Sequence, residues 1–438
     1  MSKENEKKEG SELMEKIVSL CKRRGFIFPG SEIYGGLAGT WDWGHFGLAL
    51  KNNVKASWWK KFVDSRRDMY GIDAAILMRQ EVWQATGHAE HFADPMVECD
   101  KCHKRFRADQ IEDKVKCADC GGKLSEARQF NMMFQTKVGA SEDSSSISYL
   151  RPETAQGVFV NFKNTVDAFH PKLPFGMAQI GKAFRNEITP RDFIFRQREF
   201  EQMEIEYFVR PEDWERYFEF FKDEMFEWIE EIGIDMTKVH DIEIAAEDRA
   251  HYSSRTVDFE FEYPFGQKEL FGLAYRSDFD LKTHKLDYID EENSKKIIPH
   301  VIEPSFGLDR AVLALLTSAY AEDEKDGEVR SYLKFKPSMA PVICAVSPLL
   351  KNKPELVEYA NTKVFAPLKA EFGRVAWDDN GNIGKRYRRQ DEIGTPFCIV
   401  VDFETLTDNE VTVRDRDTGA QERVKVEALK DYIKNRLV

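Results

Sequence analysis

Two charged stretches far apart in the chain carry the side chains best suited to chemistry. The first spans residues 184–204 and reads FRNEITPRDFIFRQREFEQME, and the second spans residues 303–310 and reads EPSFGLDR. The first predicts two extended segments joined by a short loop that holds Pro190 and Asp192, with charges where a buried hairpin would carry valines. Burying so many charges without a ligand is costly. Because arginine forks suit phosphate and carboxylate oxygens and phenylalanine faces suit a purine, the pattern predicts a site that handles ATP.

Four of the seven cysteines form a second candidate site. They make two Cys-x-x-Cys pairs separated by 14 residues, namely Cys99, Cys102, Cys117 and Cys120. Each pair can place two thiolates on one tetrahedral metal ion, and four thiolates close the coordination sphere, so we predict a structural zinc ion. Two disulfide bonds are the alternative, which a chain without an export signal disfavours. The nearby histidines are expected outside the metal shell: His88, His91 and His103. The isolated cysteines are expected to be buried as small hydrophobes: Cys21, Cys344 and Cys398.

The elements that position these groups can be predicted from periodicity. Apolar spacing predicts helices over residues 11–24, 48–63 and 211–232. Short strands are expected to dominate between Val158 and Ala274. The cysteine module, at about 85–128, resembles an insertion because the apolar strand patterns stop where it begins and resume after it. After a linker at 334–338 an α/β module is predicted, with strands at 342–345, 374–376, 397–401 and 410–414.

Composition narrows the class of protein. The chain has 438 residues, 42% of them hydrophobic, enough for two or three domains with ordinary cores. Its net charge of -13 argues against general binding to nucleic acid, but residues 339–438 hold 16 Lys+Arg and 16 Asp+Glu and are neutral, so local arginines there could contact RNA. No apolar run approaches the ~18 residues that span a bilayer. Residues 1–10 form a charged tail without an apolar signal, so we expect a cytoplasmic protein with no membrane association.

The motifs and their order resemble a known family. The chain closely resembles the homodimeric type of glycyl-tRNA synthetase, a class II aminoacyl-tRNA synthetase, nearly end to end. The motifs that carry the resemblance are Tyr34–Trp41, Arg151–Gln156, the hairpin of Arg185 and Arg198, Glu269–Leu270, Glu303–Arg310 and, near the C-terminus, Asn382–Gly394. The resemblance implies an α+β fold, with a class II catalytic domain on an antiparallel sheet at 1–338, a zinc-ribbon-like insertion at about 85–128 and an α/β anticodon-binding domain at 339–438. It also implies ATP-dependent activation of glycine to glycyl-adenylate, and transfer of glycine to the 3′ end of tRNA(Gly) in protein synthesis.

For ATP, the resemblance implies that Arg185 and Arg310 are the catalytic residues. Arg185 would hold the α-phosphate and the glycine carboxylate together, and Arg310 would pack on adenine or contact the γ-phosphate. Arg196 or Arg198 would meet the outer phosphates, and Glu269 is the expected Mg²⁺ ligand. The full expected ATP-binding set is Arg185, Asn186, Glu187, Phe195, Arg196, Gln197, Arg198, Glu199, Phe200, Glu269, Leu270, Gly307, Leu308, Asp309 and Arg310.

For glycine, the resemblance implies acidic residues around the ammonium group that also close off the space for a larger side chain. The expected set is Arg107, Glu153, Phe200, Glu201, Gln202, Met203, Glu204, Glu303, Pro304, Ser305, Phe306 and Gly307, with Arg107 the weakest member. Clustered carboxylates repel one another unless a cation lies among them, and the ammonium supplies it. The alternative is that these glutamates pair with Arg151 and Arg198 in a structural network.

The sequence departs from the family pattern at two positions. His45 stands where the dimer-forming motif normally has proline, so its rigid φ is lost, and Phe271 follows Glu269–Leu270 where many relatives carry a further acid. We still expect a homodimer.

Contacts with tRNA are predicted in two places. One basic group flanks the first cysteine pair, and consists of Lys101, Lys104, Arg105 and Arg107, for which a solvated surface is an equal alternative. The other is the dense basic run Lys385, Arg386, Arg388 and Arg389.

Other functions stay open. A synthetase for threonine, proline, serine or histidine would share the fold but is disfavoured by the acidic pocket. A non-catalytic paralogue is disfavoured because Arg185, Arg198 and Arg310 are all present. A dinucleotide made from the adenylate would be a side activity.

Overall fold

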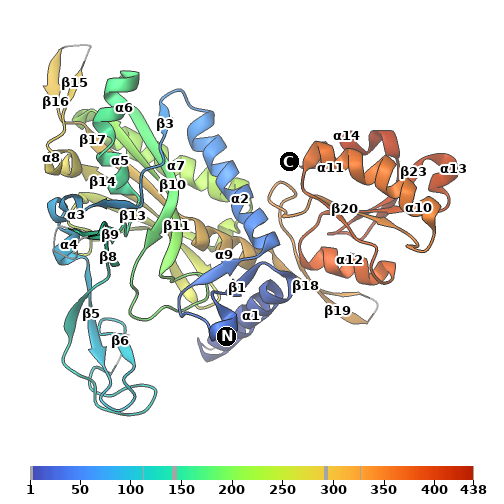
Figure 1. The fold of residues 1–438 in the computed structure, drawn as a ribbon, viewed down its shortest axis with the longest axis horizontal. Coiled ribbons are helices and arrows are strands. Elements are labelled where there is room, and N and C mark those ends of the chain that lie inside the picture. Colours follow the sequence, from blue (N-terminus) through green and yellow to red (C-terminus); the bar gives the residue numbers. More distant parts are fainter. Residues whose placement is uncertain (1–2, 112, 141–145, 291–293, 326, 438) are drawn as a thin grey trace.

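The computed structural model describes residues 3–111, 113–140, 146–290, 294–325 and 327–437. The chain forms two bodies, a large N-terminal one and a smaller C-terminal one coloured orange to red in Figure 1. Each has its own hydrophobic core. The first core includes Met339, Ala340 and Val342, whereas Ile343 already belongs to the second. Along the chain, the boundary between the two cores therefore lies at the Val342–Ile343 peptide bond. None of the helices among the described residues is long and apolar enough to cross a membrane.

A seven-stranded sheet organises the large body. Its order is β12-β13-β14-β17-β11-β10-β3, and every neighbouring pair is antiparallel except β10 and β3. The strands are β3 (Met69–Gly71), β10 (Phe175–Phe184), β11 (Glu199–Val209), β12 (Val239–Glu243), β13 (Arg255–Tyr263), β14 (Gly266–Ser277) and β17 (His300–Gly307). Along β11 the side chains of Met203, Ile205 and Tyr207 enter the core, so those of Glu204 and Glu206 face the other side of the sheet.

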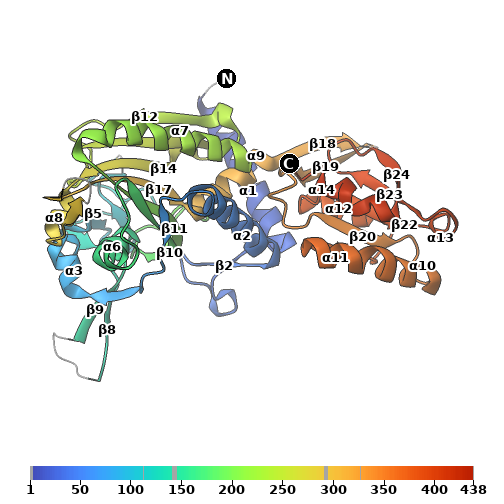
Figure 2. The ribbon, with the colours of Figure 1, turned by 90° about the horizontal axis from the view of Figure 1, so that it is seen from above.

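Four helices cover the core face of this sheet. They are α1 (Lys3–Arg24), α2 (His45–Trp59), α7 (Trp214–Ile232) and α9 (Leu308–Ala319). Figure 2 shows α7 running along the sheet beside β14 and β17. Trp58 of α2 and Trp228 of α7 both pack their rings against Phe306 of β17, with centroids 5.9 and 5.3 Å apart. The opposite face carries the shorter α5 (Ala155–Phe159) and α6 (Phe162–Phe169).

The predicted helices form with shifted ends. The helix expected over 48–63 begins three residues earlier at His45 and continues as a π-helical turn over Lys60–Asp64, and the one expected over 211–232 opens as a 3-10 turn at Pro211–Asp213. The first helix begins at Lys3, because the Lys- and Glu-rich residues expected to form a tail are good helix formers. Met1 and Ser2 of that tail lie outside the described residues. Position 10 requires glycine although it lies inside the helix, because a Cβ there would lie only 2.0 Å from the Pro264 carbonyl oxygen.

The charged hairpin differs from prediction in its loop. β10 ends at Phe184 and β11 begins at Glu199, so residues 185–198 form a long loop rather than a short one. The Arg185 amide still donates to the Arg198 carbonyl oxygen at 2.9 Å, and Arg191 and Arg196 pair through two bonds of 3.3 Å, but between these two pairs the segments separate. They separate because the Asn186 amide bonds the Met132 carbonyl and the Arg198 amide bonds the Gly39 carbonyl, each at 2.7 Å.

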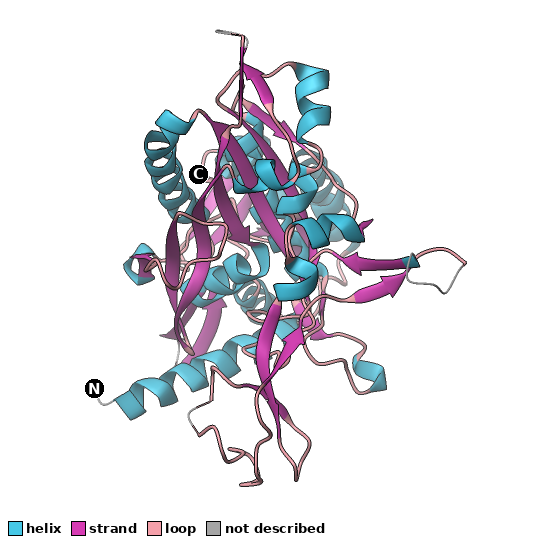
Figure 3. Ribbon diagram, turned by 90° about the vertical axis from the view of Figure 1, so that its left-hand side faces the viewer, coloured by secondary structure: helices cyan, strands magenta, loops and turns pink. Residues whose placement is uncertain are grey.

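The cysteine module projects from the large body as strands and long loops (Figure 3). Its sheet has the order β6-β5-β7, and it is inserted between β4 and β9, which pair with each other. The elements of this region are β4 (Leu77–Arg79), α3 (Gln80–Ala85), α4 (His88–His91), β5 (Ala93–Glu98), β6 (Arg105–Arg107), β7 (Arg128–Asn131), β8 (Gln135–Lys137) and β9 (Ile147–Leu150).

Smaller elements complete the large body. They are β1 (Ile27–Pro29), β2 (Trp41–Trp43), α8 (Phe279–Thr283), β15 (Tyr288–Asp290), β16 (Lys295–Ile297), β18 (Tyr320–Lys325) and β19 (Glu328–Leu333).

The C-terminal body is an α/β layer structure. Its sheet has the order β21-β20-β22-β23-β24, in which β20 lies parallel to β21 and β22 and the remaining pairs are antiparallel. The strands are β20 (Cys344–Pro348), β21 (Val375–Trp377), β22 (Phe397–Val401), β23 (Glu410–Asp415) and β24 (Gln421–Lys425). The helices are α10 (Pro354–Tyr359), continued by a π-helical segment Ala360–Phe365, then α11 (Ala366–Phe372), α12 (Ile383–Glu392), α13 (Thr405–Asp408) and α14 (Leu429–Lys434). The four predicted strands form within three residues of their expected ends, and β24 was not predicted.

The hairpin β18–β19 joins the two bodies, since α9 runs directly into β18 and β19 reaches α12 (Figure 1). On β19, Arg330 donates from Nη1 to Asp391 Oδ2 of α12 at 3.0 Å, and the same carboxylate accepts two bonds from Arg414 at 2.8 and 3.0 Å. All three side chains are buried. A buried charge pair of this kind is strongly destabilised when one partner is lost, so the contact fixes the hairpin to the second body.

Candidate active site

A cavity of about 340 Å³ opens on the face of the sheet that carries Glu204. It is lined by the long loop 185–198, by strands β11, β13, β14 and β17, and by the first turn of α9. The predicted residues that line it are Arg107, Glu153, Arg185, Glu187, Phe195, Arg196, Gln197, Phe200, Glu201, Gln202, Glu204, Glu269, Leu270, Glu303, Ser305, Gly307, Asp309 and Arg310. Segments from five separate regions of the sequence are therefore brought to one place.

Arg185 lies at the base of the loop, where the hairpin opens. Its Nε donates to the Pro152 carbonyl oxygen at 3.0 Å. Its guanidinium carbon lies 5.2 Å from the ring centre of Phe200 and 5.4 Å from that of Phe92. These contacts hold the guanidinium group in one orientation, as recognition of a planar anion requires.

Arg310 lies in the first turn of α9 and is paired with Glu269 of β14. The Arg310 Nη1 to Glu269 Oε2 distance is 3.0 Å, and the Arg310 guanidinium is the main reason that the pKa of Glu269 lies below its usual value. The same guanidinium lies 4.4 Å from the ring centre of Phe195. Asp258, on the neighbouring β13, also lines the cavity, and burial together with the nearby Glu269 raises its pKa to about 7.

Arg196 and Arg198 have different positions. Arg196 lines the cavity, 3.7 Å from Glu187 between Nη1 and Oε2. Arg198 donates to backbone oxygens instead, to Ala38 at 2.5 Å and to Glu187 at 3.0 Å, and it does not line the cavity. Of the two arginines expected to meet outer phosphates, only Arg196 lines the cavity.

Three glutamates form the acidic end of the cavity. Glu204 accepts from the Ser305 hydroxyl at 2.8 Å, from the Gln202 amide at 2.7 Å and from the Thr154 hydroxyl. Burial and the neighbouring Glu153 raise the pKa of Glu204, and these two hydroxyl donors oppose the rise.

The other two glutamates have cationic neighbours. Burial alone would raise the pKa of Glu153, but His88, whose Nε2 lies 3.3 Å from Glu153 Oε1, and the nearby Arg276 hold it well below its usual value. Glu303 accepts from Arg276 at 2.8 Å, and burial raises its pKa to about 8.

The network predicted as the alternative for these glutamates does not form. Arg151 donates to the backbone oxygens of Lys182 and Ala74 at 2.6 and 2.8 Å. The partner of the acids is Arg276 of β14, which is 1% exposed and binds Asp280 as well as Glu303. One arginine thus serves several carboxylates, which leaves the cavity with an excess of negative charge.

A lysine side chain of α2 binds two carboxylates that also line the cavity. Lys51 of α2 lies 2.5 Å from Glu201 and 2.9 Å from Asp309. The Glu201 amide in turn donates to Asp309 at 2.8 Å, which ties β11 to the start of α9.

Arg107 reaches the cavity from the cysteine module and is held by Asp94 at 2.5 Å and Asp109 at 2.8 Å.

Seven predicted site residues lie outside the cavity lining. Met203, Phe306 and Leu308 are fully buried in the core beneath the sheet. Glu199 pairs with Lys182 on the strand edge. The others are Asn186, Arg198 and Pro304.

Six residues that were not predicted line the cavity, namely Met132, Ile194, Tyr252, Thr256, Asp258 and Phe271. Phe271, which stands where many relatives carry a further acid, packs its ring against Phe306 and Trp228 in the core, with centroids 4.9 and 5.8 Å apart. For Asp258 the alternating strand pattern DFEFEY was the only available signal, and it does not separate a cavity-facing acid from a solvated one.

Comparison with known proteins follows the same division of the chain. A model of the class II tRNA synthetase core domain (G, H, P, S and T) matches residues 134–319, and one of an anticodon binding domain matches 343–436. A glycine–tRNA ligase of Caldanaerobacter subterraneus is 46% identical over 97% of this chain and 98% of its own length. Those of Bacillus anthracis and Lachnospira eligens are 46% and 47% identical over 97% of this chain and 99% and 98% of their own lengths.

The chain belongs to the glycine–tRNA ligase family. The predicted fold class and family are confirmed: this glycine–tRNA ligase has a class II synthetase core and an anticodon-binding domain. It is an enzyme of the aminoacyl-tRNA synthetase class.

The four clustered cysteines of this ligase could hold a metal ion. They are free thiols whose sulfur atoms all lie within 4.8 Å of one another, with Cys99 and Cys120 at 3.5 Å and Cys102 and Cys117 at 3.7 Å. A tetrahedral ion with bonds of ~2.3 Å to sulfur needs sulfur atoms ~3.8 Å apart. The donor set therefore fits one four-coordinate ion.

The basic groups predicted to contact tRNA are only partly available. In α12, Arg386 is buried and donates to the carbonyl oxygens of Pro348 and Asp379, and Arg389 is bound to Asp378. Lys385 and Arg388 are exposed. In the cysteine module, Lys104, Arg105 and Arg107 each have an acidic partner, and Lys101 is exposed.

Proposed function

We propose that the protein activates glycine in the cavity by attack of the glycine carboxylate on the α-phosphorus of ATP, and then passes the glycyl group to the 3′ end of tRNA(Gly). The observation that carries the proposal is the opposition of two charge types in one cavity. All five residues that carry these charges line the cavity. Glu153, Glu204 and Glu303 neighbour one another and Arg276, whereas Arg185 and Arg310 neighbour Glu269. A zwitterion with its ammonium among the acids directs its carboxylate toward the arginines.

The attacking group needs no general base, because a free carboxylate is ionised at neutral pH. Arg185, fixed by Pro152 and the two phenyl rings, binds the glycine carboxylate and the α-phosphate together and offsets the charge that develops at phosphorus. Arg310 and Arg196 then contact the remaining phosphates and the adenine side of the nucleotide.

Discrimination against larger amino acids rests on filled space. One extra methyl group changes affinity by only ~10–200-fold, so a pocket that merely favours glycine is not enough. The Glu204 carboxylate and the Ser305 hydroxyl, bonded to each other at 2.8 Å, occupy the region that a side chain would need. A larger amino acid would have to break that bond and leave a buried carboxylate short of a donor.

Magnesium would bind on the nucleotide side of the cavity. Glu269 is ionised beside Arg310, and Asp258 lies close enough for its pKa to respond to Glu269. Carboxylate oxygens of this kind suit Mg²⁺, which would offset negative charge on the phosphates.

The cysteine cluster would hold one structural zinc ion. Replacing Cys99 and Cys102 together with serine should lower the zinc content from about one ion per chain to near zero, because four thiolates are needed to close the shell. Zinc would be measured by atomic emission on gel-filtered protein. Replacing the buried Cys344 with serine, far from the cluster, is the control and should leave the zinc content unchanged. Zinc retained by the double variant would refute the ligand assignment.

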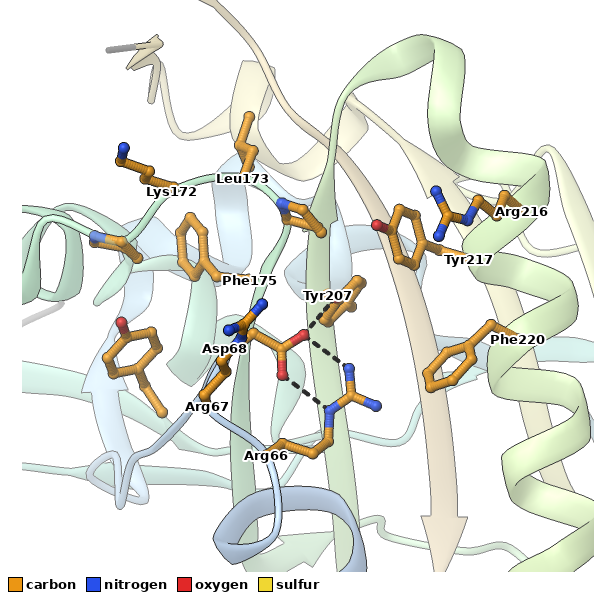
Figure 4. A pocket seen from close by; sticks show the side chains of 13 residues that line it. Arg66, Arg67, Asp68, Lys172, Leu173, Phe175, Tyr207, Arg216, Tyr217 and Phe220 are labelled. Carbon is orange, nitrogen blue, oxygen red and sulfur yellow. Dashed lines mark hydrogen bonds and ion pairs between the residues drawn. The ribbon is translucent and has the colours of Figure 1, made fainter. Parts of the chain in front are cut away.

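A homodimer would form around the edge strand β3, the strand that follows the motif containing α2. Beside β3 lies a cavity of about 580 Å³, where Asp68 binds Arg66 and Tyr207, and Arg67, Lys172 and Arg216 surround aromatic side chains (Figure 4). His45, in place of the usual proline, is the first residue of α2. The amide of a first helical residue has no partner within the helix, so both proline and histidine fit this position. Light scattering should therefore give twice the chain mass of 50.8 kDa. A mass of one chain at micromolar concentration would refute the dimer.

The acceptor end of tRNA would enter the cavity while the second body holds the anticodon stem. Lys385 and Arg388 of α12 and Lys101 of the cysteine module are exposed, and we assign phosphate contact to them. The domains would be 1–338, with the insertion at about 85–128, and 339–438. The reaction belongs to protein synthesis, and we place it in the cytoplasm.

Exchange of labelled pyrophosphate into ATP, measured with each of the twenty amino acids, tests the function. Exchange with glycine alone supports it. Exchange with threonine, proline, serine or histidine would keep the fold and discard the assignment of the acidic end. The absence of exchange by folded protein would favour a non-catalytic role.

A further inference from the structure

One buried carboxyl group beneath the cavity has no assigned role. Glu206 of β11 is 0% exposed, and neither of its carboxyl oxygens has a hydrogen-bond partner among the described residues. An ionised carboxylate in such a place would bear a desolvation cost with nothing to offset it, so burial favours the neutral acid.

The sheet register places this group opposite another acid. β11 and β17 pair Glu204 with Ser305 and Tyr207 with Ile302, so Glu206 stands across from Glu303 on the same face. One carboxylate oxygen each from Glu204, Glu206 and Glu303 lies within 4.8 Å of the others. Like charges directly opposite one another in a sheet are destabilising, so three neighbouring carboxylates will not all be ionised.

The hydrogen bonds identify which acid holds the proton. Burial raises the pKa of all three acids, but hydrogen bonds oppose that rise at two of them: Glu204 accepts from three donors, and Glu303 accepts from the Arg276 guanidinium. Glu206 has none. Across β10 its register partner is the thioether of Met177, which offers no donor.

We propose that Glu206 is a positioning residue that stays protonated and donates a hydrogen bond through its hydroxyl group to the Glu303 carboxylate. Their nearest oxygens lie within 4.8 Å of each other, and the bond forms when they approach to about 2.7 Å. The proton stays within the pair throughout the reaction. It orients Glu303 toward the ammonium of the substrate and keeps the charge at the acidic end from exceeding what one ammonium and Arg276 can balance. This role rests on the proposed glycine site.

The charged surroundings agree with a proton on Glu206. Burial raises its pKa well above the usual value, Glu303 raises it further, and Arg276 opposes the rise. The remaining acids that face it, Glu204 on its own strand and Asp280 on α8, also raise it.

Stability as a function of pH tests the proton without reference to glycine. A carboxyl whose pKa is raised on folding keeps a proton that the unfolded chain has lost, so it lowers stability progressively as pH rises from the unfolded pKa toward the folded one. Glu206→Gln has no proton to lose. Its Tm, relative to the unsubstituted protein, should therefore rise by on the order of 2 °C per pH unit between pH 5.5 and 8.

A matched variant on the same strand gives the comparison. Lys51 and Lys55 hold the pKa of Glu201 below its usual value against the effect of burial. Glu201→Gln should therefore show a constant Tm difference across the same range, since that group is ionised in both states. A constant difference for Glu206→Gln as well would refute the proton.

Kinetics test the positioning role. Glu206→Leu fills the space but cannot donate, and should raise the glycine KM about 10-fold with the ATP KM unchanged, the cost of one hydrogen bond to a charged group. Glu206→Gln can donate from its amide and should restore most of the loss. A glycine KM raised equally by the glutamine and leucine variants would overturn the role. So would a divalent metal ion, additional to zinc, that is bound by the unsubstituted protein and lost in Glu206→Gln. If no variant and no parent protein exchanges pyrophosphate with glycine, the proposed function fails, while the Tm series still decides the protonation.

Discussion

Replacing Arg185 with alanine should lower glycine-dependent exchange of pyrophosphate into ATP by about 10²–10³-fold, the typical loss when one preorganised donor to a developing charge is removed. The guanidinium is held by the Pro152 carbonyl and lies between the rings of Phe92 and Phe200. Since its position is fixed before the substrates bind, its loss removes transition-state stabilisation that water cannot replace. The loss should appear mainly in kcat.

The matched control is Arg191→Ala on the same loop. Arg191 is 3.3 Å from Asp192, its side chain is 47% exposed, and it does not line the cavity. That variant should exchange pyrophosphate within about threefold of the parent, as expected for a surface ion pair worth under ~1 kcal/mol. Circular dichroism would establish that both variants are folded. Near-normal exchange by the Arg185 variant would remove this residue from the mechanism.

The second large effect is expected at the acidic end. Glu204→Gln keeps the shape of the side chain and removes its charge, so the glycine KM should rise about 100-fold, in line with the ~2–5 kcal/mol lost when one partner of a buried charge pair is truncated. The ATP KM should change by less than about twofold, since Glu204 lies away from the arginine end. Initial rates of pyrophosphate exchange, with each substrate varied in turn, measure both constants.

Glu199→Gln on the same strand is the control, because Glu199 pairs with Lys182 and lies outside the cavity lining. Neither KM should change by more than about twofold. If Glu204→Gln raised the glycine and ATP KM values equally, Glu204 would hold the sheet together rather than bind the ammonium.

Local patterns predicted most of the framework. The helices over 48–63 and 211–232 and the strand over 397–401 follow from apolar periodicity that tertiary packing reinforces. The hairpin loop was predicted too short because its length is set by partners far along the chain. The amides of Asn186 and Arg198 bond the carbonyls of Met132 and Gly39, which no local pattern contains.

The residues that sequence reasoning missed share one cause. Asp258, Arg276 and Glu206 stand at alternating positions of strands, where a charge normally means a solvated face. Each is partly or fully buried, because Asp258 lines the cavity and Arg276 and Glu206 lie among the buried acids next to it. The same limit explains why Arg386 was assigned to RNA. Its neighbours in sequence are basic, but its own side chain caps carbonyl groups in the interior.

The hairpin β18–β19 links the cavity to the C-terminal body along one continuous path. α9 carries Arg310 in its first turn at the cavity and extends about 18 Å, at 1.5 Å per residue, before its last residue leads into the hairpin that Arg330 fastens to α12. In the proposed function, one part of the tRNA enters the cavity and another part contacts the exposed cations of α12. The distance between these two contact points would then be a criterion by which RNA molecules are selected.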